Sequence, residues 1–150
     1  MRSPIARFCI VASRFNREIT EALLKGSLEV FRAHRIPRSA VDLVWVPGAF
    51  ELPVAALRMA LSGRYRAIVA VGCILAGETP QFAYLSQAAY QGLSLAGVLS
   101  GIPVTSGVVT ARRREHARAR AKHKGLNRGR EAAEAALEMV KTLEKIRIPL

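Results

Sequence analysis

The sequence AIVAVGCILAGETPQFAY, residues 67–84, decides the fold that we expect for this chain. Residues 67–73 are nearly all apolar, which is typical of a strand buried on both faces of a parallel sheet covered by helices. A glycine-containing turn follows, and Glu78-Thr79-Pro80 offers a candidate helix cap and a proline suited to a first helical turn. Such a turn presents free backbone N–H groups that bind anions in many α/β proteins, although ordinary capped turns look the same.

Strand-like and helix-like segments alternate outward from this stretch. Apolar runs predict further strands at 7–12, 41–46 and 104–109. Apolar residues at helical spacing, or helical composition, predict helices at 17–34, 52–61, 81–99, 112–122 and 128–146. This alternation predicts a three-layer α/β/α sandwich around a four-stranded parallel sheet with right-handed crossovers.

Length and composition favour one domain over residues 1–150. A chain of 150 residues with 51% hydrophobic content supports one core. No segment approaches the roughly 18 uninterrupted apolar residues that a membrane span requires. Cys9 and Cys73 both fall in apolar runs without disulfide or zinc-ligand spacing, so we expect buried thiols and a cytoplasmic protein.

The charge is strongly positive and unevenly placed. The formal net charge is +12, and residues 112–130 hold nine lysines and arginines against the single acid Glu115. A segment this basic either binds anions or forms a solvated face. The phosphate of a small substrate, a nucleic acid backbone and acidic cargo all fit the charge.

Four strand ends are expected to meet at the carboxyl edge of the sheet. They contribute two aromatic rings, Phe15 and Phe50, and two carboxylates, Glu51 and Glu78. An aromatic face beside a carboxylate and free amides suits a flat heterocycle that carries hydroxyls. The alternatives are that the rings belong to the core and that Glu51 only stabilises a helix start. The strand-end segments are residues 15–16, 48–51, 73–79 and 106–110.

Motifs in these turns carry a family resemblance. They are SRFN (13–16), VPGAFELP (46–53), GETP (77–80) and NRGREAA (127–133). In order and spacing the chain resembles the lumazine synthases over essentially its whole length, with the amino-terminal strand of many members cut short or missing. The resemblance implies a flavodoxin-like fold of the lumazine synthase type.

The resemblance also implies a reaction of riboflavin biosynthesis. Lumazine synthases are transferases that condense 5-amino-6-(D-ribitylamino)uracil with 3,4-dihydroxy-2-butanone 4-phosphate to 6,7-dimethyl-8-ribityllumazine. They release inorganic phosphate and water and need no cofactor or metal. The implied partners are therefore these two small molecules and further copies of the chain.

Site residues follow from the resemblance by position. Phe15 would stack on the pyrimidine, and Glu51 would accept hydrogen bonds from the ribityl hydroxyls. Backbone N–H groups of Glu78 and Thr79 would hold the phosphate, with Arg120 as a cationic clamp and Lys124 nearby. The full set of implied pyrimidine and ribityl contacts is Phe15, Ala49, Phe50, Glu51, Cys73, Ile74, Leu75 and Ser106.

The catalytic position departs from the family pattern. Gln81 stands where the family has a general acid/base histidine, and an amide can orient a group but cannot shuttle a proton. Losing such a relay costs typically about 10²- to 10⁴-fold in rate. His116 and His123 are candidate replacements, although a lone histidine on a basic surface helix is more often solvated.

Further departures surround the expected pocket. Ser106 replaces a phenylalanine beside the pyrimidine, and Ala83 replaces an aspartate. An acidic or polar turn has become the arginine triplet 112–114.

Three functions are compatible with these observations. The leading one is lumazine synthase activity, slowed by the change at Gln81. The second is a self-assembling shell protein with weakened catalysis that binds anionic cargo. The third, nucleic-acid binding, rests on charge alone and lacks an aromatic platform or recognised motif. The resemblance implies pentamers or sixty-subunit icosahedral shells, with Ser106 and Arg120 reaching the site from a neighbouring subunit.

Overall fold

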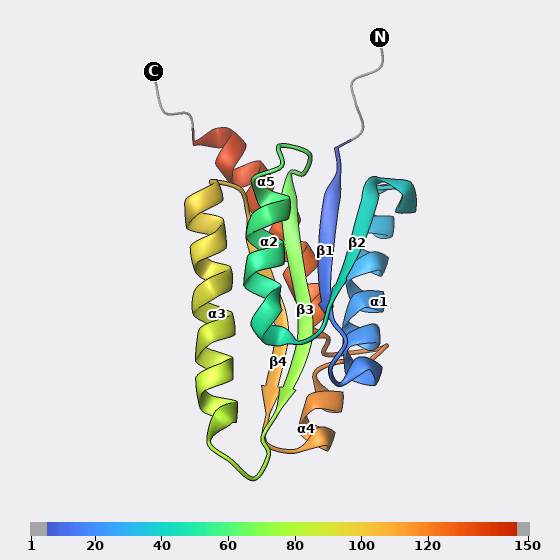
Figure 1. The fold of residues 1–150 in the computed structure, drawn as a ribbon. Coiled ribbons are helices and arrows are strands. Elements are labelled where there is room, and N and C mark those ends of the chain that lie inside the picture. The colour runs from blue at the N-terminus through green and yellow to red at the C-terminus, as the bar shows by residue number, and fades with distance from the viewer. Residues whose placement is uncertain (1–5, 147–150) are drawn as a thin grey trace.

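The computed structural model describes residues 6–146 and contains one four-stranded parallel sheet. Its strands are β1 (Phe8–Ser13), β2 (Val41–Val46), β3 (Ala67–Leu75) and β4 (Val104–Ala111). They lie in the order β2-β1-β3-β4, and every neighbouring pair is parallel (Figure 1). All carboxyl ends therefore meet at one edge of the sheet.

Helices cover both faces of this sheet and confirm the predicted three-layer α/β/α fold. One layer packs α1 against α5, and the other packs α2 against α3 (Figure 1). No helix of residues 6–146 is long and apolar enough to cross a membrane. The helices are α1 (Arg17–Ala33), α2 (Leu52–Ala60), α3 (Gln81–Ser100), α4 (Arg114–Ala119) and α5 (Arg128–Lys145), with short 3-10 turns at Arg38–Ala40 and Ala49–Glu51.

The third strand is longer than predicted. It continues past Cys73 because Ile74 and Leu75 pair with Thr110 and Ala111 of β4. The predicted turn therefore begins only at Ala76. The two additional residues extend β3 at its carboxyl end, which is the edge of the sheet where the candidate site lies.

The helix predicted at 112–122 was also wrong in extent, since α4 covers only Arg114–Ala119. Hydrogen bonds from distant parts of the chain hold the following segment in a non-helical path. The Asn127 side chain donates to the carbonyl oxygens of Ala22 and Lys122, each at 3.2 Å, and accepts from the N–H of Arg130 at 3.0 Å. Asn127 thereby caps α5 and fixes the preceding loop against α1.

Glycines allow α1 and α5 to approach closely. A Cβ atom at Gly129 would overlap the backbone of Leu23, and one at Gly26 would overlap the side chain of Asn127. The Ser27 hydroxyl donates to the carbonyl oxygen of Gly129 at 2.7 Å across the same contact. Gly129, in the motif NRGREAA (127–133), is thus needed for the close packing of α1 against α5.

A partly exposed ion pair ties the residue before β1 to β2 at the amino end of the sheet. Arg7 Nη2 and the Tyr65 hydroxyl each donate to an Asp42 carboxylate oxygen at 2.6 Å. These two hydrogen bonds lower the pKa of the Asp42 carboxyl below its ordinary value. Burial, with the Asp42 contact, raises the pKa of Tyr65 to about 12, so its hydroxyl stays protonated at neutral pH.

We expect Asp42→Asn to lower the free energy of unfolding by about 1–2 kcal/mol at pH 7, because it weakens two charge-assisted hydrogen bonds. A carboxyl whose folded pKa is depressed stabilises the protein above its unfolded pKa, about 3.8 here. The difference between wild type and variant should therefore be constant above about pH 5 and shrink as the pH falls below 4. Urea unfolding across this pH range measures it.

Glu21→Gln is the matched control for that experiment. Glu21 pairs with Arg17 at 2.7 Å on the exposed face of α1, so its removal should change stability by less than about 0.5 kcal/mol. An Asp42→Asn effect no larger than this control, or one that grows at low pH, would contradict the assignment.

Candidate functional site

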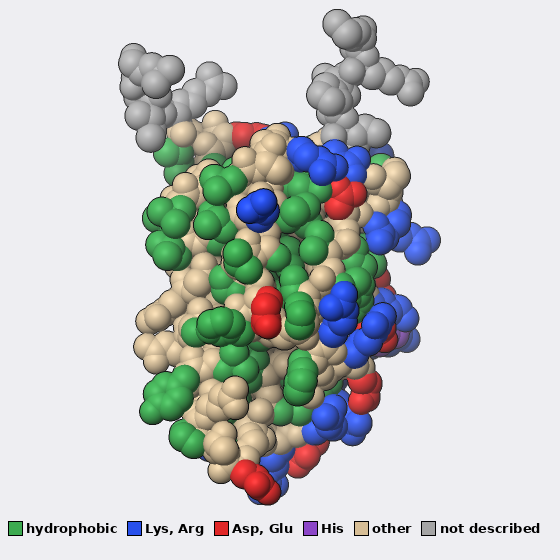
Figure 2. All heavy atoms as spheres, viewed as in Figure 1, with side chains coloured by type: hydrophobic (Ala, Val, Ile, Leu, Met, Phe, Trp, Pro, Cys, Tyr) green, Lys and Arg blue, Asp and Glu red, His purple; other side chains and the backbone are tan. Residues whose placement is uncertain are grey.

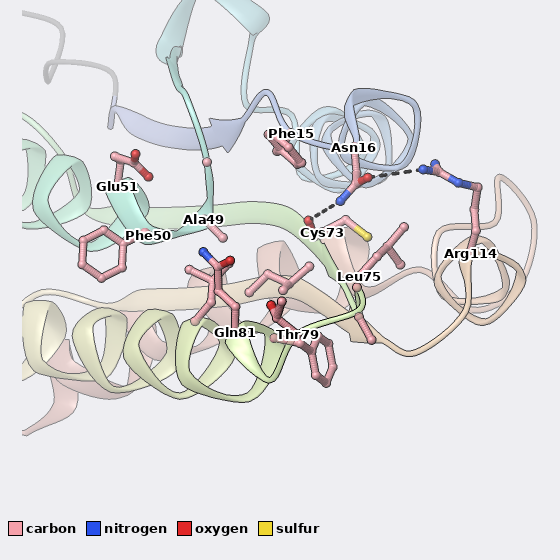
Figure 3. A pocket seen from close by; sticks show the side chains of 16 residues that line it. Phe15, Asn16, Ala49, Phe50, Glu51, Cys73, Leu75, Thr79, Gln81 and Arg114 are labelled. Atoms are coloured by element: carbon pink, nitrogen blue, oxygen red, sulfur yellow. Dashed lines mark hydrogen bonds between the residues drawn. The ribbon is translucent and has the colours of Figure 1, made fainter.

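A cavity of about 570 Å³ lies at the carboxyl edge of the sheet, where β1, β2 and β3 meet the starts of α2 and α3 (Figure 3). Its volume is in the range of small-molecule sites. The lining residues are Phe15, Asn16, Gly48, Ala49, Phe50, Glu51, Cys73, Ile74, Leu75, Ala76, Gly77, Thr79, Gln81, Phe82, Leu85 and Arg114.

Two aromatic rings form walls of this cavity. Phe15 is 74% exposed and Phe50 is 66% exposed, so neither ring belongs to the core as the alternative interpretation held. Covering an exposed aromatic ring with a flat apolar surface removes both surfaces from water and so lowers the free energy. The cavity therefore offers stacking surfaces that the folded chain itself leaves open.

Glu51 places a carboxylate at the edge of the cavity beside Phe50 (Figure 3). It is the N-cap residue of α2, but its side chain makes no cap hydrogen bond within the described residues. The carboxylate oxygens are therefore available as acceptors to a hydroxylated ligand. Glu51 does lie at the start of α2, where a carboxylate is favoured by the helix dipole, and this position leaves its oxygens open to the cavity.

Asn16 fixes the turn that carries Phe15. Its backbone lies in the left-handed region (φ 57°), which asparagine tolerates better than most residues. Its Nδ2 donates to the carbonyl oxygen of Cys73 at 2.9 Å (Figure 3). The N–H groups of Arg14 and Phe15 donate to the carbonyl oxygens of Val46 and Pro47 at 2.8 and 3.1 Å. Sequence reasoning quoted Asn16 in a motif but assigned it no role.

The cysteine in the cavity contributes backbone rather than thiol chemistry. Cys73 is 2% exposed, and burial raises its pKa to about 11. Burial likewise raises the pKa of Cys9 to about 12. Both thiols are protonated at neutral pH, and thiols in this form are poor nucleophiles. The segment from Cys73 to Leu75 therefore presents its main chain and apolar side chains to a ligand.

The start of α3 forms the floor of the cavity beside Thr79 and Gln81. Pro80, not Thr79, is the N-cap residue, and no side chain of the described chain caps this helix. N–H groups in a first helical turn lack intrahelical partners, so these remain available to an anion. The Gln81 amide points into the cavity (Figure 3), whereas Glu78 is exposed and does not line it.

Besides Glu78, three predicted residues lie outside this cavity in the single chain. Ser106 is the third residue of β4 and pairs with Ala70, so its predicted place in a strand-end segment is wrong. Arg120 follows α4, donates to the carbonyl oxygen of His116 at 2.9 Å and lines a separate hollow. Lys124 is exposed in the loop before α5.

Neither candidate histidine replaces the missing base within one chain. His116 lines the separate hollow with Arg120, and His123 Nδ1 lies 3.5 Å from Glu29 Oε1. No histidine occurs among the described residues that line the cavity. Gln81, which is expected at the catalytic position, does line the cavity.

Sequence reasoning missed Arg114 as a cavity residue. It belongs to the basic segment, but nothing in the sequence distinguishes it there from its eight basic neighbours. The structure places its Nη2 at 3.4 Å from Asn16 Oδ1, at the end of the cavity opposite Glu51 (Figure 3).

Comparison with known proteins identifies the family of this chain. Residues 5–144 match the family model described as 6,7-dimethyl-8-ribityllumazine synthase. The chain belongs to the 6,7-dimethyl-8-ribityllumazine synthase family. Lumazine synthase 1 of Caulobacter vibrioides is 44% identical over 148 residues, which is 98% of this chain and 97% of the relative. A lumazine synthase of Xanthomonas oryzae pv. oryzae is 42% identical over 144 residues, 96% of this chain and 94% of the relative.

Membership of the lumazine synthase family confirms the resemblance drawn from the turn motifs. It also confirms the implied class of activity, a transferase of riboflavin biosynthesis. The family's fold agrees with the α/β/α sandwich observed here.

Proposed function

We propose that this lumazine synthase condenses 5-amino-6-(D-ribitylamino)uracil with 3,4-dihydroxy-2-butanone 4-phosphate in the cavity at the carboxyl edge of its sheet. The observation that carries the proposal is the juxtaposition of an exposed stacking ring, an uncommitted carboxylate and an uncapped helix start in one cavity. Phe15, Glu51 and the first turn of α3 supply these features. Each matches one part of the two substrates.

The pyrimidine substrate occupies the side of the cavity formed by β1, β2 and β3. Its ring stacks on Phe15, and the main chain from Cys73 to Leu75 contacts the ring edge and ribityl chain. Ala49 and Phe50 line the chain, and the carboxylate of Glu51 accepts hydrogen bonds from its hydroxyls. Charge-assisted hydrogen bonds of this kind are about twice as strong as neutral ones.

The butanone phosphate binds with its phosphate at the start of α3. The backbone N–H groups of Glu78 and Thr79, together with the helix dipole, favour an anion there. Arg120 and Lys124 complete the phosphate site from a neighbouring copy, as does Ser106 on the pyrimidine side. This arrangement accounts for the position of all three residues outside the cavity of their own chain.

Catalysis rests mainly on proximity. The cavity holds the amine of one substrate against the carbonyl carbon of the other, which favours formation of the imine with loss of water. Fixed positive charge at the phosphate site stabilises the leaving inorganic phosphate. Gln81 orients water or the phosphate by hydrogen bonding, but proton transfers then depend on solvent.

Steady-state formation of 6,7-dimethyl-8-ribityllumazine, followed by its absorbance, tests the proposed function. Purified protein with both substrates should exceed the spontaneous condensation measured without protein. Phe15→Ala, which removes the stacking surface from an exposed ring, should raise the KM for the pyrimidine substrate. Product formation at the spontaneous rate at every protein concentration would refute the proposal.

We propose that the outer surface of α2 and α3 mediates assembly into pentamers and sixty-subunit shells. Figure 2 shows hydrophobic side chains spread over this face, while lysine and arginine gather toward α1 and β2. A second copy of the chain fits such a surface, because large apolar areas left in water favour association. Exposed large apolar residues of this layer are Phe50, Val54, Leu61, Tyr84, Tyr90, Leu95, Val98 and Leu99.

A site shared between subunits predicts complementation. Glu51→Gln and Arg120→Gln should each lower activity strongly when alone. When the two variants are refolded together in equal amounts, about one site in four combines an intact pocket with an intact neighbouring arginine. Activity should recover to about a quarter of the wild-type value. If the activity of the mixture does not exceed the average activity of the two variants measured separately, the site is not shared between subunits.

We also assign the protein to the cytoplasm, as a single domain. Cys9 and Cys73 are both buried and free, as is common where thiols stay reduced. The match to the family spans residues 5–144, so no second unit is required for the activity.

A further inference from the structure

Arg114 is a charged residue of the cavity that the proposed mechanism does not use. It is the first residue of α4 and one of three consecutive arginines that replace the usual polar turn. Among the described residues that line the cavity, only Glu51 and Arg114 carry formal charge. Figure 3 shows them at opposite ends, so the cavity is electrically polarised along its length.

The guanidinium of Arg114 is held beside the turn that carries the stacking ring. Its Nη2 donates to Asn16 Oδ1 at 3.4 Å, and Asn16 Nδ2 in turn donates to the carbonyl oxygen of Cys73 at 2.9 Å. This chain of contacts crosses the ends of β1 and β3. The positive charge of Arg114 therefore lies beside the space that a ring stacked on Phe15 would occupy.

Within residues 6–146, the contact with Asn16 is the only hydrogen bond of the Arg114 guanidinium. Glu18 is its nearest acid, but Glu18 already accepts hydrogen bonds from Arg118 at 3.1 and 3.2 Å. The Arg118 hydrogen bonds are the main cause of the lowered pKa of Glu18. Arg114 Nη1 lies 3.9 Å from the same carboxylate, beyond hydrogen-bond distance. A guanidinium has several N–H donors in one plane, and one weak contact with Asn16 does not use them.

We infer that Arg114 binds the carbonyl-bearing edge of the pyrimidine ring and is a specificity-determining residue contributed by the same subunit as Phe15. This inference rests on the proposed function. A pyrimidinedione presents carbonyl oxygens at its rim, and these are acceptors for a planar donor such as guanidinium. Asn16 is the positioning residue, since its Oδ1 accepts a hydrogen bond from the Arg114 guanidinium at 3.4 Å.

This role differs from that of Arg120. Arg120 is assigned to the phosphate of the other substrate and comes from a neighbouring copy, whereas Arg114 lines the cavity of its own chain. The two arginines should therefore affect the affinity for different substrates. Steady-state kinetics with each substrate varied in turn separates the two roles.

The test compares Arg114→Gln and Arg114→Lys with the control Arg113→Gln. Arg113 is adjacent in sequence, 72% exposed at its side chain and outside the cavity. We expect Arg114→Gln to raise the KM for the pyrimidine substrate about tenfold, the effect of losing one hydrogen bond to a charged group. The KM for butanone phosphate should change less than twofold, as should both constants in Arg113→Gln. Arg114→Lys, which keeps the charge without the planar fork, should lie between wild type and Arg114→Gln.

Two further measurements keep the outcomes distinct. Thermal unfolding of each variant should match wild type, and the product lumazine should bind about tenfold more weakly to Arg114→Gln. If Arg114→Gln is active and its KM for the pyrimidine substrate is unchanged, the inference about Arg114 is overturned but the proposed function is not. A rise confined to the KM for butanone phosphate would also overturn the inference. If Arg114→Gln does not fold, the affinity of Arg114→Lys for the product lumazine is the test. Weaker binding than wild type supports the inference, and unchanged binding overturns it. A wild-type protein that neither binds the lumazine nor forms it would overturn the proposed function, and the inference with it.

Discussion

Gln81→His is expected to form the lumazine product about 10²-fold faster than the wild-type protein, because a histidine there can transfer protons that the amide cannot. The Gln81 side chain already points into the cavity from the first turn of α3, so the imidazole would enter the same space. Its charge should titrate near pH 6.5, so the variant's rate should change across pH 6–7. Steady-state absorbance assays over pH 5–9 measure both effects.

Gln87→His is the matched control. Gln87 lies on α3 as well, but it is exposed and does not line the cavity, so its replacement should leave the rate and its pH dependence unchanged. An equal rate for Gln81→His and wild type would mean that proton transfer does not limit turnover. The proximity of the two substrates would then account for the rate without a relay.

Gly129→Ala is expected to have the largest effect on stability, lowering the free energy of unfolding by about 3 kcal/mol. The new methyl group would overlap the Leu23 backbone, which cannot turn aside as a flexible side chain can. Separation of α1 from α5 would also break the hydrogen bond from Ser27 to the Gly129 carbonyl. For a chain of this size, the midpoint of thermal unfolding should fall by roughly 6–12 °C.

Gly97→Ala provides the comparison at a helical glycine with room for a methyl group. Its nearest neighbour would be the Val104 side chain at 3.6 Å, an ordinary contact. That substitution should be neutral or stabilising by up to about 1 kcal/mol, since alanine reduces the entropy of the unfolded chain. If Gly129→Ala and Gly97→Ala lose equal amounts of stability, the close packing of α1 against α5 is not the cause of the Gly129→Ala effect.

Much of the fold could be predicted because local signals agree with the tertiary structure. The strand at Val41–Val46 and the start of α3 at Gln81 matched the prediction, since prolines and glycines mark the boundaries nearby. The segment 112–122 was predicted less well. Its composition favours a helix, but Asn127 and its bonds to Ala22 and Lys122 override that preference from elsewhere in the chain.

The candidate site was predictable to the extent that it lies at strand ends. Phe15, Phe50 and Glu51 follow strands directly, so the parallel topology brings them together. Arg114 could not be selected, because its place depends on where α4 begins and on its contact with Asn16. Ser106 was assigned to the strand-end segment 106–110, although the strand predicted at 104–109 already contained it, and β4 ends only at Ala111.

The left-handed turn at Asn16 has a consequence for the thermodynamics of ligand binding. The turn is hydrogen-bonded to the end of β2 through Arg14 and Phe15 and to β3 through the Asn16 amide, so the chain's own contacts hold its backbone in place. Ordering a free loop on binding would subtract from affinity, whereas this backbone is already preorganised. The entropy lost when a heterocycle stacks on Phe15 is therefore chiefly that of the ligand and of one phenyl side chain.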